Sequence, residues 1–241
     1  MRAEQFTYPA HNTTLLAAYD GRFESVLIVP HPFISLPFSL AWNKTREYPS
    51  DEQILAQGTK YPWSAVAAET GLGSCARVCQ ALLTSIGSLP AHLADPAAMK
   101  TLQSFLETQP IWMPTEGRFE PLLRADFLRA FALARAPELI FVPEFPQSDP
   151  VLTLPIAKLR NGSIPFPPRG TLLAPDHSFL FTVDWDSFFT LFYGPRELVT
   201  SISTSLNLEG FFAAPTTEHA WFNYSMGCST ATLSPEHWQN I

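Results

Sequence analysis

The most hydrophobic part of the chain, residues 174–202, predicts a buried strand, a bend and a helix. Large apolar side chains recur at every second position, at Phe179, Phe181, Val183 and Trp185. Successive side chains of an extended chain point to opposite faces, so these four share one face, while Asp184 and Asp186 share the other. Pro195 suits the first turn of a helix, and apolar residues follow it at helical spacing, at Leu198, Ile202 and Leu206.

Shorter patterns predict the other elements. Strands are expected at residues 23–29, 138–145, 210–213 and 219–224, and helices at 51–57, 63–70, 74–86, 95–107 and 122–135. Residues 151–159 fit a strand or a short helix, and Ser234 is expected to cap a last short turn. Helices concentrate in the first half and strands at the two ends, which favours an α+β fold with a mixed or antiparallel sheet. We expect one domain over residues 1–241, with 51–135 as a candidate helical lobe.

Composition narrows the class of protein. Of the 241 residues, 46% are hydrophobic and only 15% are charged, so a large core is expected and disorder is not. The net charge is −7 and no basic run occurs, which argues against nucleic acid and anionic membranes as partners. The longest apolar run, residues 25–42, is interrupted by three prolines and a histidine, so it does not predict a membrane span.

Two further features predict a soluble, cytoplasmic protein. The first twelve residues lack the apolar core of a signal peptide. The three cysteines, Cys75, Cys79 and Cys228, are too few for a disulfide framework, which indicates a reducing compartment. Cys75 at a helix start could act as a nucleophile, but no base is identifiable beside it, so a buried apolar role is favoured.

The densest group of acids and histidines is the main candidate for chemistry. It comprises Asp176, His177, Asp184 and Asp186, with Glu218 and His219 further along the chain. Such residues serve in general acid–base catalysis or as metal ligands. In a regular strand, however, His177 would share a face with Phe179 rather than with Asp184. Aspartates that cap turns and a hydrogen-bonded core histidine are the favoured reading. No HExxH or CxxC spacing is present, so no metal is assigned and the cofactor is unknown.

Three other residues are candidates for binding. Glu116 and Arg118 lie in an apolar segment, where a buried pair would have to satisfy its charges, although an ordinary ion pair fixing the loop is the alternative. Trp185 is one of six tryptophans that either line a ligand groove or interface or pack in the core.

Five segments resemble one family. They are HPFISLP (31–37), YPSDEQIL (48–55), TSIGSL (84–89), PTEGRFEPLL (114–123) and DHSFLFTVDWDSFF (176–189). Together they resemble the bacterial domain-of-unknown-function family 2711, over most of the chain. In the family's pattern, histidines stand near the positions of Val183 and Phe188, and their loss here argues against a metal site on that strand. The resemblance implies a bacterial protein and supplies no catalytic residues.

Two classes of function follow. The first, which we prefer, is a non-enzymatic protein-binding module of an immunity or regulatory type, because charge is low, aromatics are many and no complete catalytic set is present. The alternative is a hydrolase-like enzyme that uses the Asp/His group around residues 176–186. The oligomeric state and the identity of the partner do not follow from the sequence.

Overall fold

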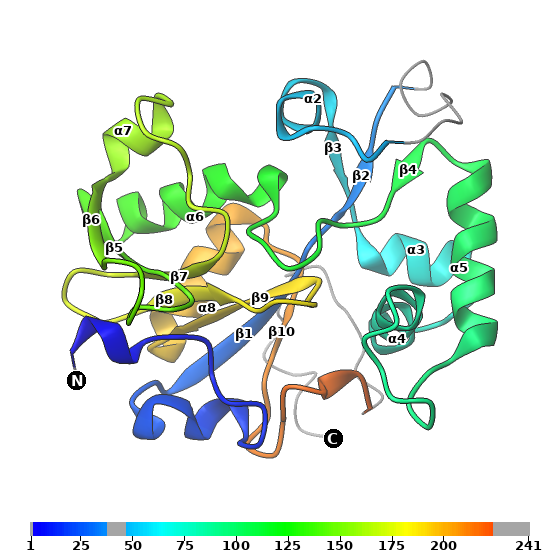
Figure 1. Cartoon of the computed structure of the whole chain (residues 1–241), viewed down its shortest axis with the longest axis horizontal. Helices are drawn as coiled ribbons and strands as arrows, with labels where there is room; N and C mark the ends of the chain where they lie inside the picture. The colour runs from blue at the N-terminus through cyan, green and yellow to red at the C-terminus, as the bar shows by residue number, and fades with distance from the viewer. Residues whose placement is uncertain (1, 38–46, 224–241) are drawn as a thin grey trace.

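A seven-stranded antiparallel sheet forms the centre of the molecule in the computed structural model, which describes residues 2–37 and 47–223 (Figure 1). Its strand order is β10-β1-β9-β8-β7-β5-β6. In chain order these strands are β1 (Ser25–Pro30), β5 (Glu138–Val142), β6 (Leu152–Pro155), β7 (Gly170–Leu173), β8 (Leu180–Val183), β9 (Phe189–Gly194) and β10 (Phe211–Phe212). Every residue of β1, β7, β8 and β9 is buried, so the middle of the sheet is covered on both faces.

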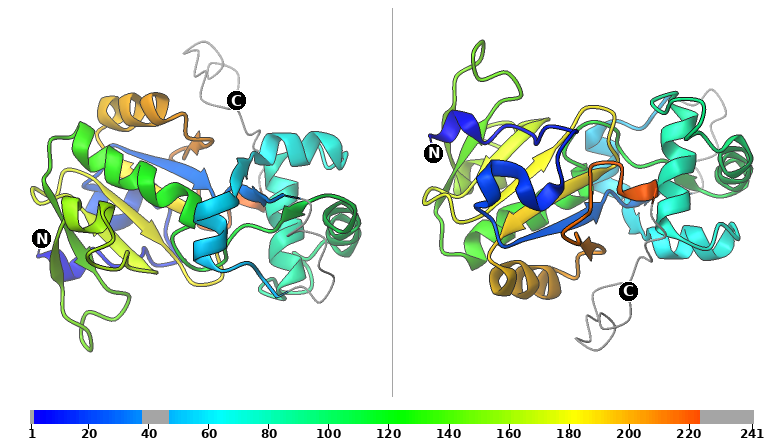
Figure 2. Two further views of the ribbon diagram at one scale, coloured as in Figure 1. Left: turned by 90° about the horizontal axis from the view of Figure 1, so that it is seen from above. Right: turned by 90° about the horizontal axis from the view of Figure 1, so that it is seen from below.

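One face of the sheet carries a row of paired apolar residues. Register places Phe192 of β9 opposite both Leu27 of β1 and Phe181 of β8, and Phe181 opposite Leu172 of β7. Helices α6 (Pro121–Leu133), α7 (Ile156–Arg160) and α8 (Arg196–Leu206) pack on this face and contribute to the same core (Figure 2). Cross-strand pairs of large apolar residues stabilise a sheet, so this row explains the density of phenylalanine in the sequence.

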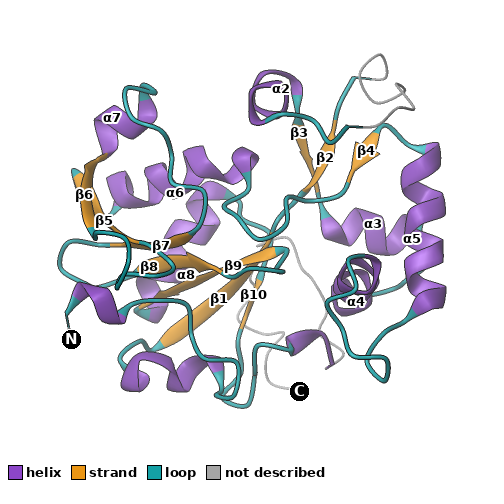
Figure 3. Ribbon diagram, in the orientation of Figure 1, coloured by secondary structure: helices purple, strands orange, loops and turns teal. Residues whose placement is uncertain are grey.

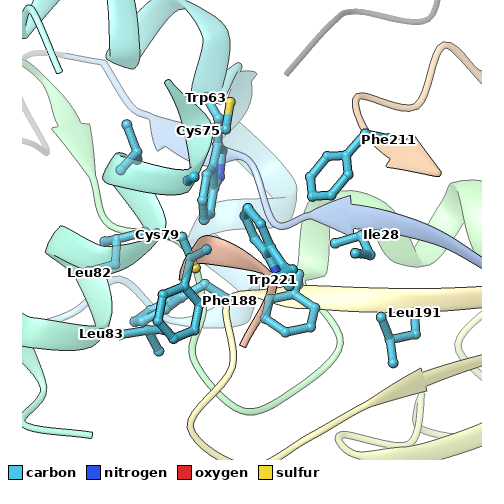
Figure 4. Packing of buried hydrophobic residues seen from close by; sticks show 14 of the residues in the cluster. Ile28, Trp63, Cys75, Cys79, Leu82, Leu83, Phe188, Leu191, Phe211 and Trp221 are labelled. Atoms are coloured by element: carbon cyan, nitrogen blue, oxygen red, sulfur yellow. The ribbon is translucent and has the colours of Figure 1, made fainter. Parts of the chain in front are cut away.

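The opposite face is covered by the N-terminal segment and by the helical part of the chain. The 3₁₀ turns η1 (Ala3–Gln5) and η2 (Leu15–Gly21) lie on the sheet, and η3 (Trp221–Asn223) meets helix α4 (Cys75–Ser85). Trp221 and Phe188 pack there with Cys79 and Leu82 of α4, which joins the helical part to the sheet in one core (Figure 4).

A small second sheet lies beside these helices, in the order β3-β2-β4 (Figure 3). Its strands are β2 (Phe33–Ser35), β3 (Thr59–Tyr61) and β4 (Ile111–Trp112), and the helices around it are α2 (Asp51–Gln57), α3 (Trp63–Glu69), α4 and α5 (Pro96–Thr108). The Pro-His-Pro segment 30–32 connects β1 directly to β2, so one chain segment links the two sheets. The independent folding of a lobe over residues 51–135 stays a prediction, and α6, within that range, packs on the large sheet.

Helix α3 begins at a carboxylate from a distant part of the chain. The two carboxylate oxygens of Glu209 accept hydrogen bonds from the backbone N–H groups of Trp63 and Ser64, at 2.8 and 2.9 Å. These N–H groups have no partner inside the helix, so Glu209 satisfies donors that would otherwise be unpaired.

Replacing Glu209 with alanine is therefore expected to lower the free energy of unfolding by about 1–2 kcal/mol, as loss of a helix cap does. Urea unfolding of Glu209→Ala measures this loss. Glu107→Ala, which removes an exposed carboxylate from the last turn of α5, is the matched control and is expected to change stability by less than about 0.5 kcal/mol. Equal losses in the two variants would contradict the capping role.

The sequence predicts most elements, and the α+β class with an antiparallel sheet is confirmed. Residues 151–159 form both alternatives in turn, β6 and then α7. Two predictions were wrong. The predicted helix after Pro195 is present as α8, but strand β9 lies between it and the bend after residue 185, and residues 221–223 form a 3₁₀ turn rather than a strand. The turn expected after Ser234 lies outside the described residues.

None of the described helices is long and apolar enough to cross a membrane.

Candidate metal centre

Two histidines and an aspartate from three separate segments meet at the C-terminal end of β8, the central strand of the large sheet. His11 Nε2 lies 2.7 Å from Asp184 Oδ2, and His219 Nε2 lies 3.8 Å from the same oxygen. One ligand atom from each residue lies within 4.8 Å of the other two. The imidazole rings of His11 and His219 are stacked, with centroids 3.9 Å apart. The three side chains thus converge on one small volume.

Local backbone pairing brings the two histidines together. Thr14 and Glu218 form an isolated antiparallel bridge, and the Leu15 N–H donates to the Thr217 carbonyl oxygen at 2.8 Å. The segment that holds His11 therefore runs alongside the segment that holds His219. Asp184 follows the last residue of β8, so the rigid sheet fixes its position. A site supported by strand ends and paired segments is held more precisely than one on a free loop.

Tyr8 is a hydrogen-bond partner of His219. Its phenol oxygen lies 2.9 Å from His219 Nδ1, and burial raises the pKa of the phenol well above its usual value. A metal at Nε2 of His219 would require the tautomer in which Nδ1–H donates to this oxygen, and the phenol oxygen can accept that bond. A second ring nitrogen that donates to a neighbouring oxygen is the usual support of a metal-binding histidine.

Burial lowers the pKa of His219 to about 4, and the neighbouring His11 acts in the same direction, while Asp184 opposes them. The ring is therefore neutral at physiological pH. A neutral imidazole is the form that ligates metals.

The three donors are of the types that divalent first-row transition metals prefer. Imidazole nitrogen and carboxylate oxygen bind Zn²⁺ at about 2.0–2.2 Å, which places tetrahedral ligands about 3.4 Å apart. The present separations, from 2.7 Å to within 4.8 Å, lie around that value. Two histidines and one carboxylate leave coordination positions open, as in catalytic rather than structural sites. The His11 side chain is 58% exposed, so an ion can reach the group from solvent.

Of the residues singled out in the sequence, the structure brings together Asp184 and His219. His11 was missed. It stands alone in an irregular N-terminal segment, and no spacing in the sequence connects it to Asp184. The backbone bridge between residues 14 and 218 makes the connection, and such an isolated bridge leaves no periodic pattern.

Asp176 and His177 lie at the other end of β8, in the turn between β7 and β8. Asp176 Oδ1 accepts hydrogen bonds from the N–H and hydroxyl of Ser178, at 3.0 and 2.6 Å, so it caps the turn as the favoured interpretation of the sequence expected. His177 occupies the left-handed backbone region, with φ of 59°, and its ring packs on Phe6. Neither residue shares a site with Asp184.

Glu116 and Arg118 do not form a pair with each other. Arg118 binds Asp51 Oδ1 at 2.8 Å. Burial and the neighbouring carboxylate of Asp186 raise the pKa of Glu116. Both carboxylates are largely exposed beside the turn between β8 and β9. The expected Glu/Arg ion pair was therefore wrong, because Arg118 finds its partner in helix α2 instead.

The remaining candidates lie apart from the ligand group. Trp185 is 56% exposed, outside the strand that was expected to include it, and Arg169 stacks over its ring at 4.1 Å. Glu218 is exposed and contributes its backbone to the bridge with Thr14. Cys75 is disulfide-bonded, so it is not an available nucleophile, and the expectation of a reduced thiol was wrong for it. Cys79 is a buried free thiol, as expected, and burial raises its pKa.

Comparison with known proteins identifies the family. The model of the family described as "Protein of unknown function (DUF2711)" matches residues 11–223. The chain belongs to this family. The DUF2711 match begins at His11 and includes Asp184 and His219. A relative, "Uncharacterized protein YwbB" of Bacillus subtilis (strain 168), is 20% identical over 215 residues, which cover 86% of this chain and 94% of that protein. No solved structure matches.

The family resemblance is thus confirmed, and the bacterial relative agrees with the expected source. Val183 and Phe188, near which the resemblance expected histidines in the family pattern, are both buried in apolar cores here. The two histidines of the candidate metal centre come from other segments of this DUF2711 protein. His11 precedes the first strand of the large sheet in the sequence, and His219 follows the last one.

Proposed function

We propose that this DUF2711 protein binds a divalent transition-metal ion through His11, Asp184 and His219, and that it uses the ion in a hydrolase-like reaction. The convergence of three ligand atoms within 4.8 Å carries the proposal. It replaces the sequence-based assignment of no metal, which followed from the absence of a local ligand motif. It also no longer assigns acid–base catalysis to Asp176 and His177.

The proposed reaction follows from the open coordination positions. A metal ion held by three protein ligands retains water, and a bound Zn²⁺ lowers the pKa of that water towards 7. Such an ion, held by His11, Asp184 and His219, would supply activated water for the hydrolysis of an ester, amide or phosphoester bond. Tyr8, whose phenol oxygen lies within hydrogen-bond distance of Nδ1 of His219, would keep this ligand's ring oriented. Trp185, which directly follows Asp184, and Glu116, whose carboxylate lies near Asp186, are candidates for contacting a substrate.

Metal binding is expected to depend on each ligand. We predict that Zn²⁺ binds the wild-type protein at one site, and that His11→Gln and Asp184→Asn each weaken this binding at least about tenfold, as loss of a metal ligand does. Isothermal titration with ZnCl₂ measures the affinity. His92→Gln provides the matched control, because His92 is an exposed histidine distant from the group in the chain, and it is expected to bind like the wild type.

The two parts of the proposal can be separated. A thermal-shift measurement with and without chelator reports binding alone, since a ligand at a hundred times its dissociation constant stabilises the native state by about 2.7 kcal/mol. Release of p-nitrophenol from ester and phosphoester substrates reports hydrolysis. Unchanged zinc affinity in both ligand variants would contradict the metal site. Tight binding without any turnover would retain the site and contradict the hydrolase.

A protein-binding module remains the second candidate, supported by one surface feature. Trp185 is exposed, and the guanidinium of Arg169 lies over its ring while Glu144 binds Arg169 Nε at 2.7 Å. Tryptophan and arginine are the residues that most often carry binding energy at protein interfaces. Absence of metal binding in the titration would leave this class of function ahead.

A further inference from the structure

A cleft lies between α2, α6 and α7, apart from the candidate metal centre. It has a volume of about 1070 Å³, just above the usual range for small-molecule sites. Its apolar walls include Leu128 of α6 and Phe166 of the loop after α7. Leu55 of α2 also lines it and is 57% exposed, which is unusual for a leucine. Part of the cleft therefore offers apolar surface to solvent.

Arginines gather around this apolar surface. Arg124 and Arg129 of α6 and Arg160 of α7 line the cleft. Arg160 has no ion-pair partner among the residues that the structure describes. Arg129 is 61% exposed and lies 3.7 Å from Asp126, whose other carboxylate oxygen is bound by Lys60. Both outer arginines thus retain donors for a ligand.

Arg124 is the most buried of the three arginines, and neighbouring side chains hold it in place. The Arg124 side chain is only 14% exposed, and its guanidinium binds Asp51 Oδ2 at 2.6 Å and lies 5.5 Å from the centre of the Phe166 ring. Asp51 is shared with Arg118, at 2.8 Å. Three guanidinium groups, those of Arg124, Arg129 and Arg160, therefore line the cleft against two carboxylates, Asp51 and Glu52, in a chain whose net charge is −7. The cleft is a positive region on an acidic protein, which favours an anion.

We propose that this cleft binds a small organic anion with a carboxylate or phosphate head on an apolar body. The planar guanidinium groups of Arg129 and Arg160 bind the head, because arginine matches both groups with paired hydrogen bonds. Leu55, Leu128 and Phe166 cover the body. The proposal is independent of the metal centre, since the two sites share no residue.

Fluorescence titration with 8-anilinonaphthalene-1-sulfonate, an aromatic body that carries an anionic head, tests the site in the full chain with a chelator present. The wild-type protein is expected to bind the probe saturably. The double variant Arg129→Gln/Arg160→Gln and the single variant Leu55→Gln are each expected to weaken binding about tenfold or more, which corresponds to about 1.4 kcal/mol. All three side chains are exposed, so the variants are expected to fold, and an unchanged melting temperature confirms this.

Lys100→Gln is the control for loss of positive charge elsewhere, since Lys100 is exposed on α5, and it is expected to bind like the wild type. Competition then defines the ligand. Decanoate and decyl phosphate are expected to displace the probe, whereas decanol and inorganic phosphate at the same concentration are not. Equal binding by the cleft variants and wild type, or displacement by decanol as effective as by decanoate, would overturn the proposal.

Discussion

Replacing Phe181 with alanine is expected to lower the free energy of unfolding by about 3–5 kcal/mol, the range for removing a large buried side chain. Phe181 is fully buried in β8, and its ring stacks on Phe192 of β9 with centroids 4.2 Å apart. Phe127 of α6 packs on it from above the sheet, at 4.7 Å. The substitution therefore removes contacts in both the sheet and the layer of helices, and leaves a cavity that these rings cannot easily fill.

Urea unfolding measures the effect as a shift of the transition midpoint with an unchanged slope. Leu133→Ala is the control, because Leu133 is an apolar residue of the neighbouring helix α6 that is 53% exposed. It is expected to change stability by less than about 0.5 kcal/mol. A loss below about 1 kcal/mol in Phe181→Ala would show that the aromatic row is not the centre of the core.

Acidification is expected to destabilise the protein through His31. This residue is fully buried in the Pro-His-Pro segment that links the two sheets. Its Nδ1 lies 2.9 Å from the Thr115 carbonyl oxygen, which can only accept, so Nδ1 carries the proton. Nε2 then accepts from the Thr190 hydroxyl, also at 2.9 Å. Burial lowers the pKa of His31 to about 4, although the bond to Thr115 acts in the opposite direction.

The sign of the pH dependence follows from this lowered pKa. Above pH 6.5 the ring is neutral in both the folded and the unfolded chain, and the stability is fully present. As the pH falls from 6.5 to about 4, the unfolded chain binds a proton that the folded chain does not, so stability is lost. The difference between the two pKa values corresponds to a loss of about 3 kcal/mol at this residue.

The contribution is isolated by comparing wild type with His31→Gln between pH 7.5 and 4. Other titrating groups act equally in both proteins, so the stability difference between them reports His31 alone. The variant is expected to be less stable at pH 7.5, because a shorter amide cannot make both hydrogen bonds, and the difference is expected to narrow by about 3 kcal/mol on acidification. Parallel pH profiles would contradict a neutral buried ring.

Elements whose local sequence pattern is clear could be predicted from the sequence. Elements that depend on pairing with distant segments could not. Helices α4 and α5 begin at Ser74 and Asp95, whose side chains cap them as expected. Strand β9 was missed because it is buried on both faces and so shows no alternation of polar and apolar residues. Trp185 was assigned to the strand that precedes it, but strand pairing ends at Val183.

The candidate site was predicted in part for a related reason. Asp184 and His219 were recognised by residue type, yet their partnership depends on a third residue, His11, that is 173 positions from Asp184. Asp176 and His177 are close to Asp184 in sequence and were grouped with it, whereas the four residues of β8 place them at opposite ends of a strand. Sequence proximity misleads where an extended strand separates its ends.

The central claim, that His11, Asp184 and His219 form a metal site, is tested most directly by crystals grown with ZnCl₂ and measured at the zinc absorption edge. The account predicts an anomalous difference peak about 2.0–2.2 Å from a nitrogen of each histidine and from a carboxylate oxygen of Asp184. The His11–Asp184 hydrogen bond of 2.7 Å should then be replaced by bonds to the ion. The claim would be contradicted if no peak lay between the three residues and the His11–Asp184 hydrogen bond remained intact. The zinc concentration in this experiment should be one that saturates the protein's sites in solution.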